Sequence, residues 1–339
     1  MKKGLYWAGI GVLGLFLGAC AGLETKTGTH PQTAAPIIQE RVFEGFVAVI
    51  AGEGDTWSSL AVRYLNDPGL DWLISEFNGG GNLEPGRGVI IPRKPFGLGG
   101  LERQGFQTVP VLSYHQFSNQ ESNRMTVTKA AFSEQMNFLK ENGYRVVTLE
   151  QLFDFLDFNK PLPPKSVVIT IDDGWKSAYE IAFPILKTQG FPATLFVYTD
   201  LISGSEKTLS WDQVKEMAEN GLDIQCHTKS HLDLTAVEKN VSFRDYFSRI
   251  EEDLSACTSM IKKKLDRKTD YLAYPFGNTN QLVISLLIKQ GYRGAFTVKR
   301  GGNPFFVHNF RVNRSMIYGD YTLEKFKKNL AVFQEEVLP

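Results

Sequence analysis

From residue 108 onward, short apolar runs of strand length alternate with longer amphipathic stretches. The apolar runs cover residues 109–114, 145–148, 167–171, 193–198, 222–226, 271–274 and 294–298. Helical periodicity marks the intervening stretches at 131–141, 179–189, 211–220, 242–264 and 281–290. This alternation predicts a mainly parallel sheet covered by helices, either as a barrel or as an open doubly wound sheet.

Two adjacent carboxylates, Asp172 and Asp173, end the β-branched run at 167–171 and are followed by Gly174. A strand this apolar is expected to be buried on both faces. Paired acids at its end do not serve packing, so they are candidates for chemistry. Barrel enzymes carry their catalytic groups at the C-terminal ends of the strands, and this placement favours the barrel.

A pair of histidines, His227 and His231, follows the apolar run at 222–226. Residues four apart on a turn or helical segment can project to the same side. Paired imidazoles are common ligands of a divalent metal, and one carboxylate from the first cluster would complete a set of three.

Composition and net charge limit the size of the core and the class of partner. The chain has 339 residues, 42% of them hydrophobic, so it can bury a full-sized core with room for one large domain and a small one. Its 37 basic and 37 acidic residues balance. Nothing in the overall charge favours a nucleic-acid partner.

The N-terminus predicts export. Two lysines precede an apolar run at 5–17, which is typical of a secretory signal covering residues 1–19. Leu17-Gly18-Ala19-Cys20 resembles the bacterial lipoprotein box, which implies a mature chain beginning at a lipidated Cys20 and anchored to a membrane. Ala21 would direct it to the outer membrane in a Gram-negative host. The alternative is a plain signal or anchor with an incidental cysteine.

Residues 20–43 are rich in polar residues and predict a flexible tether. Residues 44–95 predict a compact β-α-α-β unit, and residues 96–105 a glycine-rich linker to the domain at 106–339.

The small unit resembles a LysM module. The resemblance rests on Gly54-Asp55-Thr56-Trp57 at its start, Phe77-Asn78 at its centre, and Pro85-Gly86 with Ile91-Pro92 at its end. It implies binding to polymers that contain N-acetylglucosamine. The alternative is a spacer or a protein contact built on the same fold.

The large domain resembles the polysaccharide deacetylases of the NodB-homology group, carbohydrate esterase family 4. Three of its stretches match that family's first three motifs, namely Thr170-Ile171-Asp172-Asp173-Gly174, His227-Thr228-Lys229-Ser230-His231 and Ala273-Tyr274-Pro275-Phe276-Gly277. Residues 109–115 resemble its first barrel strand, and Leu209-Ser210-Trp211-Asp212 a wall segment. The fold implied is a distorted (β/α) barrel.

The resemblance also implies roles for individual residues. Asp173, His227 and His231 would hold a divalent metal, most readily Zn, and Asp172 would be the general base. The backbone N–H of Phe276 would share the oxyanion with the metal. Such a site would remove N-acetyl groups from a polysaccharide.

The same motif places Tyr274 and Pro275 beside Phe276 at the substrate. Trp211 is expected either to line the sugar groove or to belong to the core. Cys226 and Cys257 can pair outside the cytoplasm or remain buried thiols. Because side chains alternate along a strand, Cys226 is expected to point away from the ligand face.

The chain departs from the family pattern at two positions. Ala273 stands where many members carry an arginine that orients the base; Arg293 is a weak substitute, because surface solvation explains it as well. The family's last motif offers a histidine, in an L-x-H pattern, that protonates the departing amine. The nearest match is Phe306-Val307-His308, which points to His308 as the general acid, with His115 the other histidine open for the role. The alternative is that His308 is an ordinary strand or loop histidine.

The sequence therefore predicts an exported, lipid-anchored, metal-dependent de-N-acetylase of an N-acetylglucosamine polymer. One alternative is a glycan-binding lipoprotein whose barrel has lost turnover. The other is an O-deacetylase, since amide and ester carbonyls need the same catalytic groups.

Overall fold

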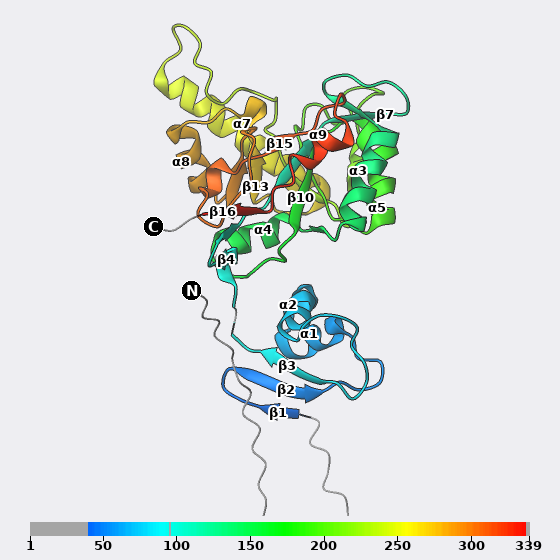
Figure 1. Cartoon of the computed structure of the whole chain (residues 1–339). Helices are drawn as coiled ribbons and strands as arrows, with labels where there is room; N and C mark the ends of the chain where they lie inside the picture. Colours follow the sequence, from blue (N-terminus) through cyan, green and yellow to red (C-terminus); the bar gives the residue numbers. More distant parts are fainter. Residues whose placement is uncertain (1–39, 95, 337–339) are drawn as a thin grey trace, which may run out of the picture.

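The computed structural model describes residues 40–94 and 96–336, which form a small N-terminal domain and a larger α/β domain (Figure 1). The predicted signal peptide, Cys20 and most of the predicted tether lie outside the described residues. Among the residues described, no helix combines the length and the apolar character needed to cross a membrane.

The small domain is a three-stranded antiparallel sheet in the order β1-β2-β3, with two helices between its second and third strands. Its elements are β1 (Glu40–Val42), β2 (Phe46–Ile50), α1 (Trp57–Leu65), α2 (Asp71–Phe77) and β3 (Gly88–Pro92). The predicted β-α-α-β order is therefore present, with one additional strand at the start.

Side-chain hydrogen bonds explain two of the polar residues that the small domain's motifs contain. The Thr56 hydroxyl accepts the backbone N–H of Ser59 at 3.0 Å and so caps α1. Asn78 ties the end of α2 to β3, because its Nδ2 donates to the Ile90 carbonyl at 2.7 Å and its Oδ1 accepts from the Ile90 N–H at 2.8 Å.

Two boundaries differ from those predicted. Strand β1 lies in the predicted tether; its three residues are all exposed, so it shows no alternation by which the sequence could reveal it. The predicted linker at 96–105 contains β4 (Leu101–Glu102), which pairs with β5 (Gly105–Gln107). Strand β5 also pairs with β16 (Phe333–Glu335), so the linker is held by the C-terminal end of the chain.

The large domain is built on a curled parallel sheet in the order β14-β13-β12-β11-β10-β6-β15. These strands are β6 (Val111–Tyr114), β10 (Ser166–Asp173), β11 (Thr194–Val197), β12 (Asp223–Cys226), β13 (Tyr271–Ala273), β14 (Gly294–Phe296) and β15 (Ser315–Met316). A short additional strand, β9 (Arg145–Val146), pairs with β10. The apolar runs of the sequence correspond to all of these strands except β15.

The segment at 312–316 joins the two edges of this sheet. The Thr297 N–H donates to the Val312 carbonyl at 2.9 Å, beside β14. Three residues later the same segment becomes β15 and pairs in parallel with β6 through Ser315 and Leu112. The predicted distorted barrel is therefore confirmed, with its closure made by this segment.

Alternation along β10 divides the core in two. Val167, Ile169 and Ile171 pack outward in the large hydrophobic cluster beneath the helices. Val168 packs in a second cluster with Val111, which lies on the neighbouring strand. By the period of two, Asp172 continues the row of Val168 into the barrel.

Helices cover the outside of the barrel (Figure 1). They are α3 (Lys129–Glu141), α5 (Phe183–Gln189), α6 (Trp211–Glu219), α7 (Phe243–Leu265), α8 (Gln281–Lys289) and α9 (Leu323–Lys327). Helix α4 (Leu149–Leu156) instead packs in the second cluster, with Val111 and Val168. The two domains touch through ion pairs on the side of α2: Arg145 contacts Asp71 at 2.8 Å, and Lys160 contacts Asp67 at 3.0 Å.

Candidate active site and metal centre

A tight turn at the end of β10 presents its two carboxylates differently. Asp173 has a left-handed φ of 79° and Gly174 a φ of 116°. This φ of Gly174 favours glycine, and a Cβ there would also lie 2.5 Å from the Ile202 Cδ1, so the Ile202 side chain would have to move. As a result Asp172 is 1% exposed inside the barrel, whereas Asp173 is half-buried at its rim.

The structure brings Asp173, His227 and His231 together, with their ligand atoms all within 4.8 Å of one another. The Asp173 Oδ1 lies 3.6 Å from the His227 Nε2 and 3.7 Å from the His231 Nε2. Ligand atoms about 2.1 Å from a tetrahedral Zn²⁺ lie roughly 3.4 Å apart. The observed spacing therefore suits an ion held by these three residues.

The surroundings of His227 favour its neutral form, which is the form that can bind a metal. Its Nδ1 lies 2.7 Å from the Ala273 carbonyl oxygen, a contact that fixes the ring and turns the Nε2 toward Asp173. Burial lowers the pKa of His227 to about 4, against the opposing effect of the nearby carboxylates. The imidazole is therefore uncharged at neutral pH, as coordination requires.

Arg314 binds the other carboxylate. Its Nη1 donates to the Asp172 Oδ1 at 2.7 Å, and the arginine side chain is fully buried. Its Nε donates to the Thr297 carbonyl at 3.1 Å, and its guanidinium carbon lies 5.5 Å from the centre of the Phe196 ring. The family's arginine, which Ala273 replaces here, was expected to orient the carboxylate of Asp172. Arg314 makes that contact instead.

Asp172 is ionised in spite of its burial. Desolvation alone would raise its pKa, but the charges of Arg314, His227 and His115 bring the pKa down to about 2. One of its oxygens is bound to Arg314. The other, Oδ2, lies 3.9 Å from the His115 Nε2 and 3.4 Å from the Ser113 hydroxyl. Asp172 can accept a proton only as a carboxylate, so this environment suits a base.

The structure places His308, the predicted general acid, away from the other groups of the site. His308 is exposed and caps the short 3₁₀ turn Asn309–Arg311. A Cβ on Gly294, the first residue of β14, would lie 2.8 Å from the Asn309 carbonyl oxygen. His308 therefore lies at the N-terminal end of a barrel strand, whereas the metal cluster and His115 lie at C-terminal ends.

Arg293 belongs to that same opposite end of the barrel. Its Nη2 lies 2.8 Å from Asp154 and 2.7 Å from Asp157, both on or just after α4. It has no contact with Asp172, so the structure excludes it as the residue that orients the base.

The motif at 273–277 contributes one exposed side chain to the site. Phe276 has a left-handed φ of 59° and is 61% exposed, and the centre of its ring lies 4.9 Å from that of the His231 ring. Tyr274 and Pro275 were expected at the substrate, but both are buried. The Tyr274 hydroxyl donates to the Phe310 carbonyl at 3.0 Å, and burial raises the pKa of Tyr274 to about 12. Tyr274 and Pro275 therefore lie on the buried side of the turn and not on its exposed side.

Trp211 belongs to the helical layer. It begins α6, packs half-buried against the core, and has the Lys264 ammonium of α7 5.9 Å from its ring. The expectation that it lines a sugar groove is therefore not met. A tryptophan that the sequence reasoning missed, Trp175, lies at the site instead and donates its indole N–H to the Asp173 Oδ2 at 2.9 Å. Its position directly after Asp172-Asp173-Gly174 could have indicated from the sequence that Trp175 lies at the site.

Cys226 and Cys257 form a disulfide between β12 and α7. Cys226 packs in the outer hydrophobic cluster, as alternation predicted, while the next residue, His227, turns toward the metal cluster. The disulfide therefore lies directly behind the first histidine.

Comparison with known proteins decides the family. Residues 159–295 match the polysaccharide deacetylase family. The chain is 30% identical over 226 residues to the poly-β-1,6-N-acetyl-D-glucosamine N-deacetylase of Staphylococcus epidermidis, a match that covers 64% of this chain and 76% of that protein. This chain belongs to the polysaccharide deacetylase family. It is a hydrolase that acts on amides.

Further relatives of the deacetylase agree. The Escherichia coli K12 poly-β-1,6-N-acetyl-D-glucosamine N-deacetylase is 28% identical over 262 residues, which cover 66% of this chain but only 39% of that protein. IcaB from Ammonifex degensii aligns in structure with a TM-score of 0.59 and 29% identity, over 67% of this chain and 98% of IcaB. The Streptococcus pyogenes deacetylase PplD, solved with acetate, aligns with a TM-score of 0.59 and 26% identity, over 67% and 99% of the two chains.

The ion pair between Arg314 and Asp172 generates a prediction. Arg314→Met should raise the pKa of Asp172 from about 2, because a buried carboxylate would lose its counter-charge. The acid limb of the deacetylase's pH–rate profile should then move to higher pH, and the free energy of unfolding should fall by about 3–5 kcal/mol. Chemical denaturation and a pH–rate series would measure both.

Two variants control this experiment. Arg314→Lys keeps the charge and should move the acid limb less. Arg293→Met removes another paired arginine, at the opposite end of the barrel, and should leave the acid limb unchanged. An unshifted acid limb in folded Arg314→Met would show that Arg314 does not control the base.

Proposed function

We propose that this deacetylase removes N-acetyl groups from a poly-β-1,6-N-acetylglucosamine in the bacterial envelope, using a divalent metal. One observation carries the proposal: the cluster of Asp173, His227 and His231 lies beside an ionised Asp172 that is itself flanked by His115. A metal site, a base and a second proton-transfer group thus meet at one end of the barrel. Two imidazoles and a carboxylate suit Zn²⁺.

The substrate class is supported by the relatives. Those from Staphylococcus epidermidis and Escherichia coli are both named as deacetylases of poly-β-1,6-N-acetyl-D-glucosamine. The match covers only 39% of the E. coli protein. That this chain shares the activity of that whole protein is therefore proposed.

The chemistry follows from where charge develops. A divalent ion in the triad would polarise the acetyl carbonyl and lower the pKa of a water. Asp172 accepts the proton of the attacking water, because its carboxylate is ionised and its Oδ2 is not bound by Arg314. His115, 3.9 Å from that oxygen, donates a proton to the departing amine. The backbone N–H of Phe276 stabilises the developing oxyanion.

The exposed ring of Phe276 gives the polymer a surface to pack on beside His231. Asp173 and His231 keep side-chain exposures of 14% and 28%, whereas that of Asp172 is only 2%. An acetyl group can therefore approach from the rim of the barrel while the base remains shielded.

We expect acetate release from poly-β-1,6-N-acetylglucosamine by the metal-loaded protein. Chelation should abolish it, Zn²⁺ should restore it, and Asp172→Asn should lose activity while still binding Zn²⁺, since Asp172 is outside the ligand triad. Release measured in parallel from O-acetylated polymers would identify an O-deacetylase if only those substrates reacted. A folded, metal-loaded chain that bound glycan and released nothing would overturn the proposal.

The two histidines give a second prediction. His115→Ala should lower kcat by about 10²- to 10⁴-fold, the range for losing a positioned acid–base group, with zinc content unchanged. His308→Ala should leave kcat near that of the wild type, because His308 lies at the opposite end of the barrel. Steady-state kinetics with metal analysis would compare them. The reverse pattern would restore His308 as the acid.

We further propose that the N-terminal part retains the enzyme at its substrate, through lipid on Cys20 and glycan binding by the LysM-like domain. The capped α1 and the Asn78 bonds to β3 support a LysM-like fold, because they account for its motif residues.

The full chain should fractionate with membranes and Cys20→Ser should not. Detergent-solubilised chain should also sediment with insoluble N-acetylglucosamine polymer. A soluble wild type, or no co-sedimentation, would contradict the respective part.

A further inference from the structure

The loop that carries both histidine ligands has an unusual backbone. Thr228 and His231 adopt left-handed φ values of 68° and 60°, although neither is glycine. β-Branched residues such as threonine rarely adopt this region, so the surrounding structure must hold the loop there. The Thr228 hydroxyl contributes by accepting the His231 N–H at 2.9 Å. That bond lies within the loop and does not fix the loop to the barrel.

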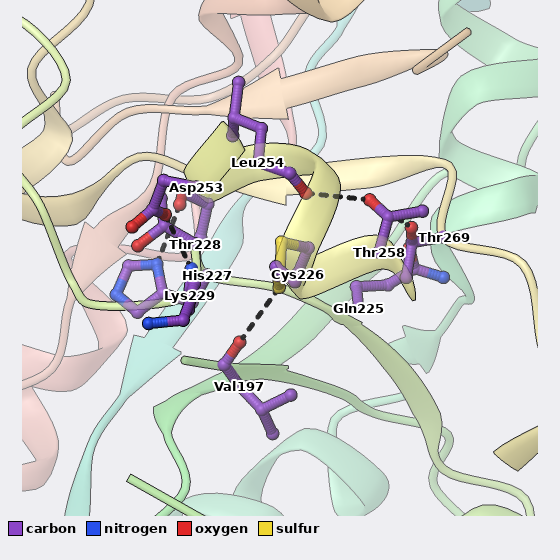
Figure 2. The surroundings of a disulfide bond; sticks show 12 residues. Val197, Gln225, Cys226, His227, Thr228, Lys229, Asp253, Leu254, Thr258 and Thr269 are labelled. Carbon is purple, nitrogen blue, oxygen red and sulfur yellow. Dashed lines mark hydrogen bonds between the residues drawn. A yellow bond between two sulfur atoms is a disulfide. The ribbon is translucent and has the colours of Figure 1, made fainter. Parts of the chain in front are cut away.

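Asp253 on helix α7 contacts the loop from outside. It is 8% exposed, and both of its carboxylate oxygens are used. Oδ1 accepts the backbone N–H of Lys229 at 2.7 Å, and Oδ2 accepts the hydroxyl of Ser230 at 2.6 Å. Lys229 and Ser230 are residues between the two histidines, and Figure 2 shows Asp253 beside this stretch. A single carboxylate therefore fixes the middle of the loop.

The same helix is fixed to the chain just before the loop. Cys257 lies one helical turn after Asp253 and is bonded to Cys226, the residue that precedes His227 (Figure 2). Its sulfur also lies 3.8 Å from the Val197 carbonyl oxygen of β11. Helix α7 thus holds the histidine segment on both sides of His227, covalently before it and by hydrogen bonds after it.

Barrel contacts complete the support on the other side of the loop. The Asp200 N–H donates to the Lys229 carbonyl at 2.9 Å, and the His227 N–H donates to the Val197 carbonyl at 2.8 Å. Lys229 is therefore held at its N–H by α7 and at its carbonyl by the segment after β11. Loss of Asp253 would remove the only side-chain acceptor that the Lys229 N–H has among the described residues.

We infer that Asp253 is a positioning residue for the metal centre: it holds the 227–231 loop in the conformation that directs His227 and His231 at one ion. This inference rests on the proposed metal-dependent function. The hydrogen bonds of Asp253 go to Lys229 and Ser230 and not to the three ligand side chains, so its effect should be on metal affinity through the loop. Residues that orient ligands from behind typically change metal affinity by about 10- to 100-fold when replaced.

The experiment measures Zn²⁺ affinity of the full chain by competition with a chromophoric chelator, beside the Co²⁺ absorption spectrum as a report of ligand geometry. Asp253→Ala should weaken Zn²⁺ binding by about 10- to 100-fold and alter the Co²⁺ bands. Asp253→Asn keeps one acceptor oxygen for the Lys229 N–H and should recover part of the affinity. Glu252→Gln removes a neighbouring exposed acid on α7 and should match the wild type.

The possible failures are distinguishable. Wild-type affinity and spectrum in a folded Asp253→Ala chain would overturn the role of Asp253 alone. A wild-type chain that binds no metal would overturn the proposed function itself. Should Asp253→Ala not fold, Ser230→Ala removes only the bond to Oδ2, and it should weaken Zn²⁺ binding by a smaller factor. Unchanged affinity in that variant and in Asp253→Asn would reject the inference.

Discussion

The buried ion pair between Arg314 and Asp172 is the interaction on which the architecture of the site depends. Two charges inside a barrel are stable only when each compensates the other. Their pairing requires the segment at 312–316 to run beside the middle of β6 and the last residues of β14. The segment that closes the barrel therefore also supplies the counter-charge of Asp172, the proposed base. Closure of the barrel and orientation of this carboxylate depend on the same segment.

The remaining groups converge because the strands are parallel. Asp173 ends β10, while His227 and His115 directly follow β12 and β6, and all these strands end at the same rim. Neighbouring residues on one strand end face different environments, and this separates their chemistry. Asp172 is buried against Arg314 and stays an ionised carboxylate, whereas Asp173, one residue later in a left-handed turn, faces the histidines at the rim.

The ligand loop shows how an unfavourable local backbone is maintained. Its two left-handed residues alternate with positions that are fixed from outside, by the disulfide before His227 and by Asp253 at Lys229 and Ser230. The outer helix α7 is thus connected to the chemistry of the rim although none of its residues is a metal ligand. A covalent bond and a buried carboxylate are both persistent supports, which suits the proposed metal site, because its ligands have to be held in place.

The sequence by itself determined what is encoded locally. Apolar periodicity revealed the strands of the main sheet except β15, and residues in the runs ending at Asp173 and His231 identified the three metal-ligand candidates. It could not identify β1, whose residues are all exposed, or choose between His115 and His308, since that choice depends on which end of a strand each occupies. Only the tertiary structure brought Arg314 to Asp172, 142 residues away along the chain, and moved Tyr274 and Trp211 from the substrate into the packing. Long-range contacts of this kind depend on strand order and barrel closure, and local patterns in one sequence predict neither.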